Sequence, residues 1–184
     1  QAAVDGLEAR ITNAALNKPV SASSHHPAAS LVNSTPDKAV DGDATTRWAS
    51  QRATGRTNAG DGVYRSEYGP VQQWLQVDLE GVYKLDNISI NWEGGCGKEY
   101  YVRGSLDGTT YFDIAHVTDG AAGIRKFEGL DDEVRFVLVD GVTPVNNMWG
   151  YSIFELEVNG ELVQPVESDF RVATYNIAAG YTPR

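Results

Sequence analysis

The chain has 184 residues, which is enough for one domain of ordinary size with a packed core and short extensions. Its formal net charge of −10 argues against a broad polyanion-binding surface, because phosphate contacts need clustered Lys and Arg, so we expect no nucleic-acid partner for this domain. The single cysteine, Cys96, excludes an internal disulfide, and the core or a bound metal must therefore stabilise the fold. We expect Cys96 itself to be buried and to pack as a small apolar side chain.

The first twelve residues are set apart from the segments that follow. Residues 1–12 carry a weak helical pattern and are interpreted as a leader or linker. Residues 13–160 contain short stretches of period-two alternation, separated by turns rich in Gly and Asp. The alternation is clearest in residues 74–79, 85–92, 135–139 and 153–158. Strands at this spacing, with few helix-length periodic stretches, predict an all-β antiparallel sandwich or barrel.

The C-terminal part of the chain changes character again. Residues 161–169 are polar and contain Pro165, which indicates a linker. Residues 170–177 resemble the first strand of the endonuclease/exonuclease/phosphatase superfamily, whose opening strand delivers an Asn, here Asn176, to a metal-dependent phosphodiester site. The resemblance implies that residues 170–184 begin a truncated domain of a parent phosphodiesterase or nuclease. A linker strand or an edge strand of the sandwich is the alternative, and in either case we expect this fragment not to be an enzyme.

The most informative segment is residues 38–48, in which two carboxylates, two hydroxyls and a glycine form a tight turn between apolar anchors. Ca²⁺ needs six to eight oxygen ligands, and a Gly lets backbone carbonyls curl towards an ion. This loop lacks the twelfth-position Glu of an EF-hand, so a further ligand must come from elsewhere in the chain. From spacing alone, an Asp-Gly turn with solvated carboxylates is the alternative interpretation.

An ordered set of segments that includes this loop resembles the discoidin domain, also called the coagulation-factor type C domain. In bacteria this is the fold of family 32 carbohydrate-binding modules. The segments that carry the resemblance are residues 15–24, 38–50, 73–79, 105–108, 135–137 and 149–158. The resemblance covers nearly all of residues 13–160 and implies a jelly-roll-like sandwich of antiparallel strands, with binding loops at one end.

The resemblance also implies one structural Ca²⁺ as the cofactor. The early loop would supply the carbonyl oxygens of Lys38 and Asp43, the carboxylate of Asp41 and both oxygens of Thr46. The last strand would supply the Phe154 carbonyl and the Glu155 carboxylate. Such an ion would join distant parts of the chain and would not contact the ligand.

Two features favour the bacterial sugar-binding branch of this family over its lipid-binding branch. Animal discoidin domains usually carry a disulfide that a lone Cys96 forbids, and the loops of this chain lack large exposed apolar residues. No apolar run is long enough to cross a bilayer, so no membrane insertion is expected. We expect a secreted or cell-surface binding module, monomeric as a fragment, that targets a larger bacterial enzyme to a glycan or cell-surface polysaccharide. The alternative is a protein–protein or domain-docking module within an endonuclease/exonuclease/phosphatase-type enzyme.

Sugar sites combine an aromatic face with planar polar groups that bind hydroxyls. The loops expected at the binding end supply six candidates of these types, namely Arg52, Tyr64, Glu93, Asn147, Trp149 and Tyr151. For Trp149 and Tyr151, burial against the core is the alternative. The remaining aromatic residues receive structural interpretations: Trp48 and Trp74 as core, Trp92 as core in preference to stacking, and His25 and His26 as a surface turn in preference to ligand contacts.

Overall fold

The computed structural model describes residues 10–27, 34–53, 68–69, 71–146 and 149–165, and the structural findings below concern these residues. They form β-strands and one short 3₁₀ helix, η2 (Pro36–Ala39), so the all-β fold class is confirmed. The strands are β1 (Thr12–Asn13), β2 (Val20–Ala22), β3 (Trp48–Ala49), β4 (Arg52–Ala53), β5 (Tyr68–Gly69), β6 (Gln73–Trp92), β7 (Gly97–Ser105), β8 (Phe112–Val117), β9 (Gly123–Glu128), β10 (Glu133–Pro144) and β11 (Ser152–Pro165). Within the described part of the chain, no helix has the length and apolar character needed to span a membrane.

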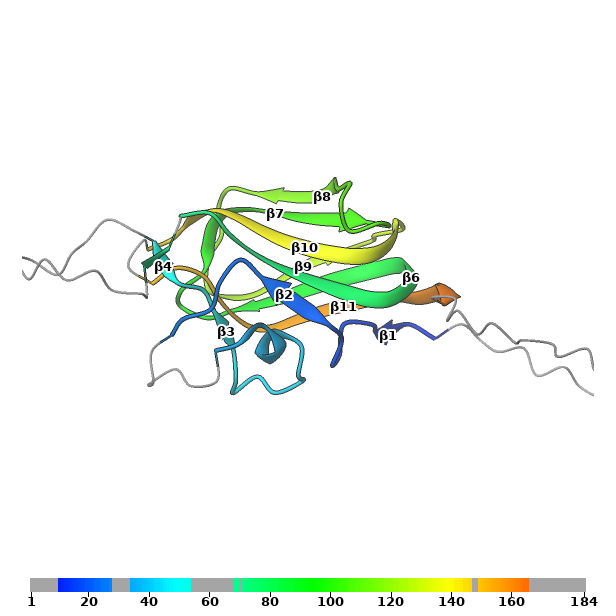
Figure 1. The fold of residues 1–184 in the computed structure, drawn as a ribbon. Coiled ribbons are helices and arrows are strands. Elements are labelled where there is room, and N and C mark those ends of the chain that lie inside the picture. The colour runs from blue at the N-terminus through cyan, green and yellow to red at the C-terminus, as the bar shows by residue number, and fades with distance from the viewer. Residues whose placement is uncertain (1–9, 28–33, 54–67, 70, 147–148, 166–184) are drawn as a thin grey trace, which may run out of the picture.

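Strand β6 connects the two layers of an antiparallel sandwich (Figure 1). The first part of β6 pairs with β2 and β10, and β10 continues this layer through β7 to β8. The second part of β6 pairs with β9 and β11, and β11 in turn pairs with β1 and β3. A long strand that passes from one layer to the other ties both halves of the core together.

The structure corrects two boundaries expected from the sequence. Residues 74–79 and 85–92 belong to one strand, β6, because the residues between them pair with β10 and β11 instead of forming a reversing turn. Glu80, with φ +55°, marks the irregular point within this strand. Strand β11 in turn continues past the expected domain end at Gly160, since Glu161 pairs with Lys84, and it reaches Pro165. Residues 161–165 of the expected linker therefore belong to β11, and residues 166–169 lie outside the described residues.

The core lies between the two layers and is built from alternate residues of the long strands. In β6 the odd-numbered residues Leu75, Val77 and Leu79 face inwards and are fully buried. The facing layer contributes buried apolar side chains of β11 and of the second part of β6, among them Ile88, Ile90, Trp92, Ile153, Leu156 and Val158. Burial of this much apolar surface supplies the main driving force for the fold without a disulfide.

Of the four side chains that were expected in the core or packed as small apolar groups, three are confirmed and one is wrong. Trp48, Trp92 and Cys96 are buried in the core, and burial raises the pKa of the Cys96 thiol above its ordinary value. Trp74, expected in the core, instead has 37% of its surface exposed. Its neighbours in β6 explain this, because Gln73 and Leu75 occupy the inward positions and Trp74 must face out with the alternation.

The two ends of the sandwich differ in what they carry. Strands β3 and β4 lie at one end, and β1 and the end of β11 lie at the other (Figure 1). The β6–β7 turn, residues 93–96, bonds to the first residue of β11, since the Ser152 N–H donates to the Gly95 carbonyl at 2.5 Å. This contact places the β6–β7 turn against the start of β11.

Candidate functional site

A pocket of about 220 Å³ opens beside β3 and β4. Its polar and aromatic lining comes from segments far apart in the sequence: His26, Arg47, Arg52, Glu93, Trp149 and Ser152. A hollow of this size with one aromatic face and several planar polar groups has the composition of a small-ligand site.

Trp149 is presented to the pocket by a tight turn. The N–H groups of Trp149 and Gly150 both donate to the Asn146 carbonyl, at 3.0 and 3.3 Å. Gly150 has φ +70°, and a Cβ there would lie 2.6 Å from the Gln51 carbonyl oxygen, so only glycine fits this position. The turn leaves 56% of the surface of Trp149 exposed, so this residue is not buried in the core.

Arg47 and Glu93 form an ion pair in the pocket, with 3.0 Å between Arg47 Nη1 and Glu93 Oε1. Glu93 Oε2 also accepts the Gly95 N–H at 2.9 Å. Sequence reasoning missed Arg47 as a site residue. No local pattern identifies Arg47, because both residues of β3 that follow it are buried and its partner Glu93 comes from a distant segment.

His26 also lines the pocket, and its interpretation as part of a surface turn is wrong. Only 4% of the residue is exposed. Its backbone N–H donates to the Ala49 carbonyl at 2.7 Å, and the Ser34 hydroxyl donates to the His26 carbonyl at 3.1 Å. These bonds draw His26 against β3, whereas the adjacent His25 is exposed.

The six sugar-site candidates fall into three groups: residues that line the pocket, a residue buried in the core, and residues outside the described part of the chain. Arg52, Glu93 and Trp149 line the same pocket. Tyr151 does not, because it is 1% exposed and its ring packs in the core near Trp92, with ring centroids 6.5 Å apart. Tyr64 and Asn147 lie outside the described residues. Tyr151 is thus corrected to a core residue, in agreement with the buried alternative.

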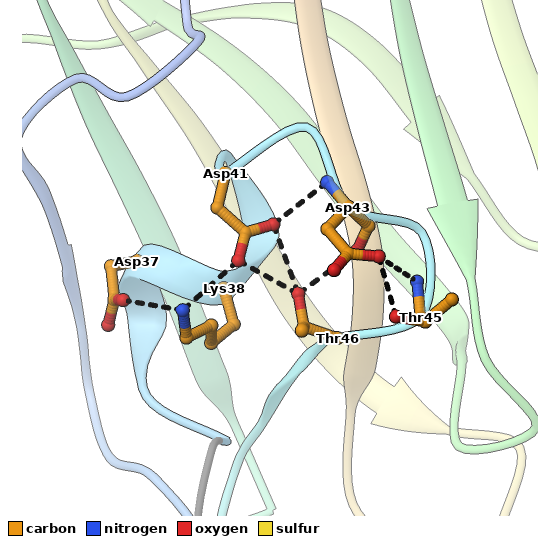
Figure 2. Close-up of polar contacts among 6 residues, drawn as sticks. All are labelled: Asp37, Lys38, Asp41, Asp43, Thr45 and Thr46. Atoms are coloured by element: carbon orange, nitrogen blue, oxygen red, sulfur yellow. Dashed lines mark hydrogen bonds and ion pairs between the residues drawn. The ribbon is translucent and has the colours of Figure 1, made fainter.

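The Asp41 loop is organised around one hydroxyl (Figure 2). Thr46 Oγ1 lies 3.0 and 2.9 Å from the two Asp41 carboxylate oxygens and 3.0 Å from the Asp43 carbonyl. The Asp43 carboxylate instead accepts the N–H and the hydroxyl of Thr45, at 2.9 and 2.6 Å. The Lys38 ammonium lies 3.1 Å from Asp41 Oδ2. The loop therefore gathers the Asp41 carboxylate, a threonine hydroxyl and the carbonyl of Asp43.

Glu155 faces this loop from β11. The pairing of β11 with β6 shifts register between Ile153 and Glu155, so Phe154 forms a β-bulge. A bulge changes the direction in which the neighbouring side chains point. Glu155 is 8% exposed, and burial together with the Asp41 carboxylate raises its pKa to about 7. For Asp41, burial acts to raise the pKa, but hydrogen bonds from the Asp43 N–H, Thr46 and Lys38 outweigh it, so the pKa is lowered.

These contacts fit the needs of a hard cation. Glu155 Oε1 is buried without a hydrogen-bond partner among the described residues, and such an oxygen is costly to bury unless something positive meets it. The arrangement has only two carboxylates, Asp41 and Glu155. Correspondingly, no group of three or more His, Cys, Asp or Glu side chains able to hold a metal occurs in the described segments. Carbonyl and hydroxyl oxygens would have to complete the ligand set, as Ca²⁺ permits.

The family assignment follows from comparison with known protein families. The model of the F5/8 type C domain matches residues 19–156, which is most of the chain. The chain belongs to the F5/8 type C domain family. The discoidin resemblance predicted from the sequence is thereby confirmed. No curated protein matches the sequence significantly.

Solved structures similar to this F5/8 type C domain include bacterial binding modules. Chitosan-binding module 1 of a chitosanase/glucanase from Paenibacillus sp. IK-5 is 29% identical, with a TM-score of 0.67 over 81% of this chain and 99% of that chain. Module 2 of that enzyme, in complex with chitotriose, is 29% identical, with a TM-score of 0.65 over 79% of this chain and 98% of that chain. The family 32 module of Clostridium perfringens NanJ, in complex with galactose, is 18% identical, with a TM-score of 0.57 over 81% and 97% of the two chains, and is a likeness of fold alone.

Proposed function

We propose that this chain is a non-catalytic carbohydrate-binding module that holds a sugar in the pocket beside β3 and β4. The observation that carries the proposal is the exposed indole of Trp149 in a pocket that also contains Arg47, Arg52 and Glu93. The C–H face of a sugar ring would stack on the indole. The guanidinium and carboxylate groups would bind its hydroxyls in pairs, and their fixed planes would select the orientation of the ring.

The solved structures support a sugar as the ligand. Two of the similar modules are chitosan-binding modules about as long as the domain described here, and one of them is in complex with chitotriose. Their level of identity to this chain also supports transfer of the ligand class more strongly than a likeness of fold alone.

We also propose one structural Ca²⁺ between the Asp41 loop and β11. Asp41 and Glu155 would supply carboxylates, Thr46 would supply its hydroxyl and carbonyl, and Lys38, Asp43 and Phe154 would supply carbonyl oxygens. The support is the buried Glu155 Oε1, which has no hydrogen-bond partner among the described residues, beside a second carboxylate. When bound, the ion supplies positive charge to both carboxylates and links an early loop to the last strand.

The role of the module in a larger protein is part of the same proposal. It would tether a secreted or cell-surface bacterial enzyme to a glycan or cell-surface polysaccharide. The similar Paenibacillus modules are parts of a chitosanase/glucanase, which supports attachment to an enzyme. The residues that suggest a phosphodiesterase-type neighbour, including Asn176, lie outside the described residues.

Calorimetric titration with a sugar panel tests the binding function. The panel contains chitotriose, its fully N-acetylated form, galactose, N-acetylgalactosamine and galacturonic acid. We expect saturable binding of at least one of them, and loss of that binding in Trp149→Ala. If the intact chain binds no member of the panel or of a wider glycan array, the sugar proposal is wrong. Capture of a neighbouring domain of the parent protein would then favour the docking alternative.

A further inference from the structure

Glu93 is held in place by three contacts at the pocket. Its backbone N–H donates to the Ser152 carbonyl at 2.9 Å, its Oε2 accepts the Gly95 N–H at 2.9 Å, and its Oε1 lies 3.0 Å from Arg47 Nη1. Both carboxylate oxygens therefore already have a donor before any ligand arrives. The Arg47 and Glu93 side chains are each about 30% exposed, so water screens the pair only in part.

The Glu93 turn lies beside the Trp149 side chain. A Cβ on Gly94 would lie 3.8 Å from Cζ3 of Trp149, and one on Gly95 would lie 3.5 Å from the Trp149 Cβ. A sugar stacked on Trp149 would consequently bring its ring substituents to the Arg47–Glu93 pair. This pair is therefore the part of the pocket best placed to discriminate between substituents.

The charge of this pair decides which substituent is accepted. A free amine on a sugar is protonated near neutral pH, and its ammonium group needs a carboxylate whose charge is not already cancelled. Glu93 is the only carboxylate among the described lining residues, and Arg47 cancels its charge. Arg52 places a second guanidinium group in the lining of the same pocket.

We propose that Arg47 is a specificity-determining residue that closes this pocket to sugars with a free amine. The pocket then takes sugars whose ring substituents are hydroxyl, acetamido or carboxylate groups. This inference rests on the proposed sugar-binding function and narrows its ligand class. It separates this chain from the similar chitosan-binding modules, because chitosan is a polymer of sugars with free amines. Discrimination by placing a like charge against the wrong ligand is a general route to specificity.

The test uses ligand pairs that differ only in acetylation of the amine. These are chitotriose and its N-acetylated form, and galactosamine and N-acetylgalactosamine, titrated near neutral pH. For the intact chain we expect weaker binding of the amine member of each pair. Arg47→Met frees the Glu93 carboxylate and is expected to shift the affinity ratio towards the amine about tenfold. Arg47→Lys keeps the positive charge and should keep the original preference.

A double variant tests whether the shift depends on Glu93, and circular dichroism tests whether each variant is folded. Arg47→Met combined with Glu93→Gln removes the freed carboxylate and should abolish the shift, while circular dichroism confirms that each variant is folded. If the intact chain prefers the amine, or if Arg47→Met leaves the ratio unchanged, the role of Arg47 is overturned while the sugar proposal stands. If only Arg47→Met binds chitotriose and the intact chain binds no sugar, the role of Arg47 stands and the sugar proposal fails. Absence of binding in both proteins overturns both.

Discussion

Trp149 and Tyr151 are separated by one residue and occupy opposite environments, the indole exposed at the pocket and the phenol buried in the core. Gly150, with φ +70°, breaks the strand geometry between them. In a regular strand, residues two apart face the same side, so this turn is what divides the two aromatic rings between binding and packing. The pair allows the two roles to be tested separately.

Trp149→Ala is expected to weaken sugar binding by at least about tenfold, because the stacking surface is lost. Its effect on stability should be small, since the side chain is mostly exposed. Titration calorimetry and thermal unfolding of the same samples measure the two effects. A variant that unfolds at a lower temperature and still binds normally would contradict the assigned role.

Tyr151→Phe is the matched control. The Tyr151 hydroxyl is buried without a hydrogen-bond partner among the described residues, and burial is the main cause that raises its pKa. Removing a buried, unsatisfied hydroxyl is close to neutral or stabilising. We therefore expect unchanged sugar affinity and a melting temperature equal to or above that of the parent chain. A clear loss of affinity would show that the Tyr151 hydroxyl takes part in sugar binding.

Gly141→Ala should destabilise the fold through Tyr151. A Cβ on Gly141 would lie 2.4 Å from Cε1 and 2.5 Å from Cζ of the Tyr151 ring. Overpacking of this kind costs about 1–3 kcal/mol, which denaturant unfolding resolves. In a Tyr151→Ala background the same substitution should cost clearly less, because the ring that it strikes is absent. Equal costs in both backgrounds would show that the clash is relieved by other movements.

The sequence predicted the fold well because its signals are local. Alternation in residues 74–79 and 153–158 marks inward and outward positions, and Asp-Gly pairs mark turns. Trp74 shows that the size of a side chain does not by itself predict whether the side chain is buried. The alternation places it with Gln76 and Asp78 on the outer face, but a large aromatic residue suggested the core.

The site was less predictable because it depends on contacts between distant segments. His26 is buried by a bond to Ala49, and Arg47 meets Glu93 across the pocket. Neither contact leaves a mark in the local pattern of either residue. Glu155 was proposed as a calcium ligand only through the family resemblance, since a carboxylate in β11 has no local link to a loop more than a hundred residues earlier.

Calcium should raise the melting temperature through Glu155. An ion bound only by the folded chain at about 100 times its dissociation constant adds about 2.7 kcal/mol, which corresponds to about 5–10 °C for a domain of this size. Verified metal-free protein should show this rise on adding Ca²⁺. Glu155→Gln should lose the response, whereas Glu157→Gln, exposed on the same strand, should keep it. Identical melting curves for the parent chain with Ca²⁺ and with excess chelator would contradict the site.

The Asp78–Arg135 pair is expected to make stability depend on acid pH. Arg135 Nε and Nη2 donate to the two Asp78 carboxylate oxygens, both at 2.8 Å, and these bonds lower the Asp78 pKa. A carboxyl group whose pKa is lowered by folding stabilises the fold above its unfolded pKa of about 3.9, and the contribution is lost as pH falls through the lower folded value.

Asp78→Asn should therefore cost about 1 kcal/mol at pH 7, in view of the partial exposure of both side chains. The difference from the parent chain should shrink steadily below about pH 4, because acid then protonates Asp78 in the parent as well. Urea unfolding at a series of pH values measures this. Asp113→Asn is the matched control, since Asp113 also pairs with an arginine but is 56% exposed, and its cost should stay below about 0.5 kcal/mol. A pH-independent cost for Asp78→Asn would mean that the carboxylate acts through packing and not through its charge.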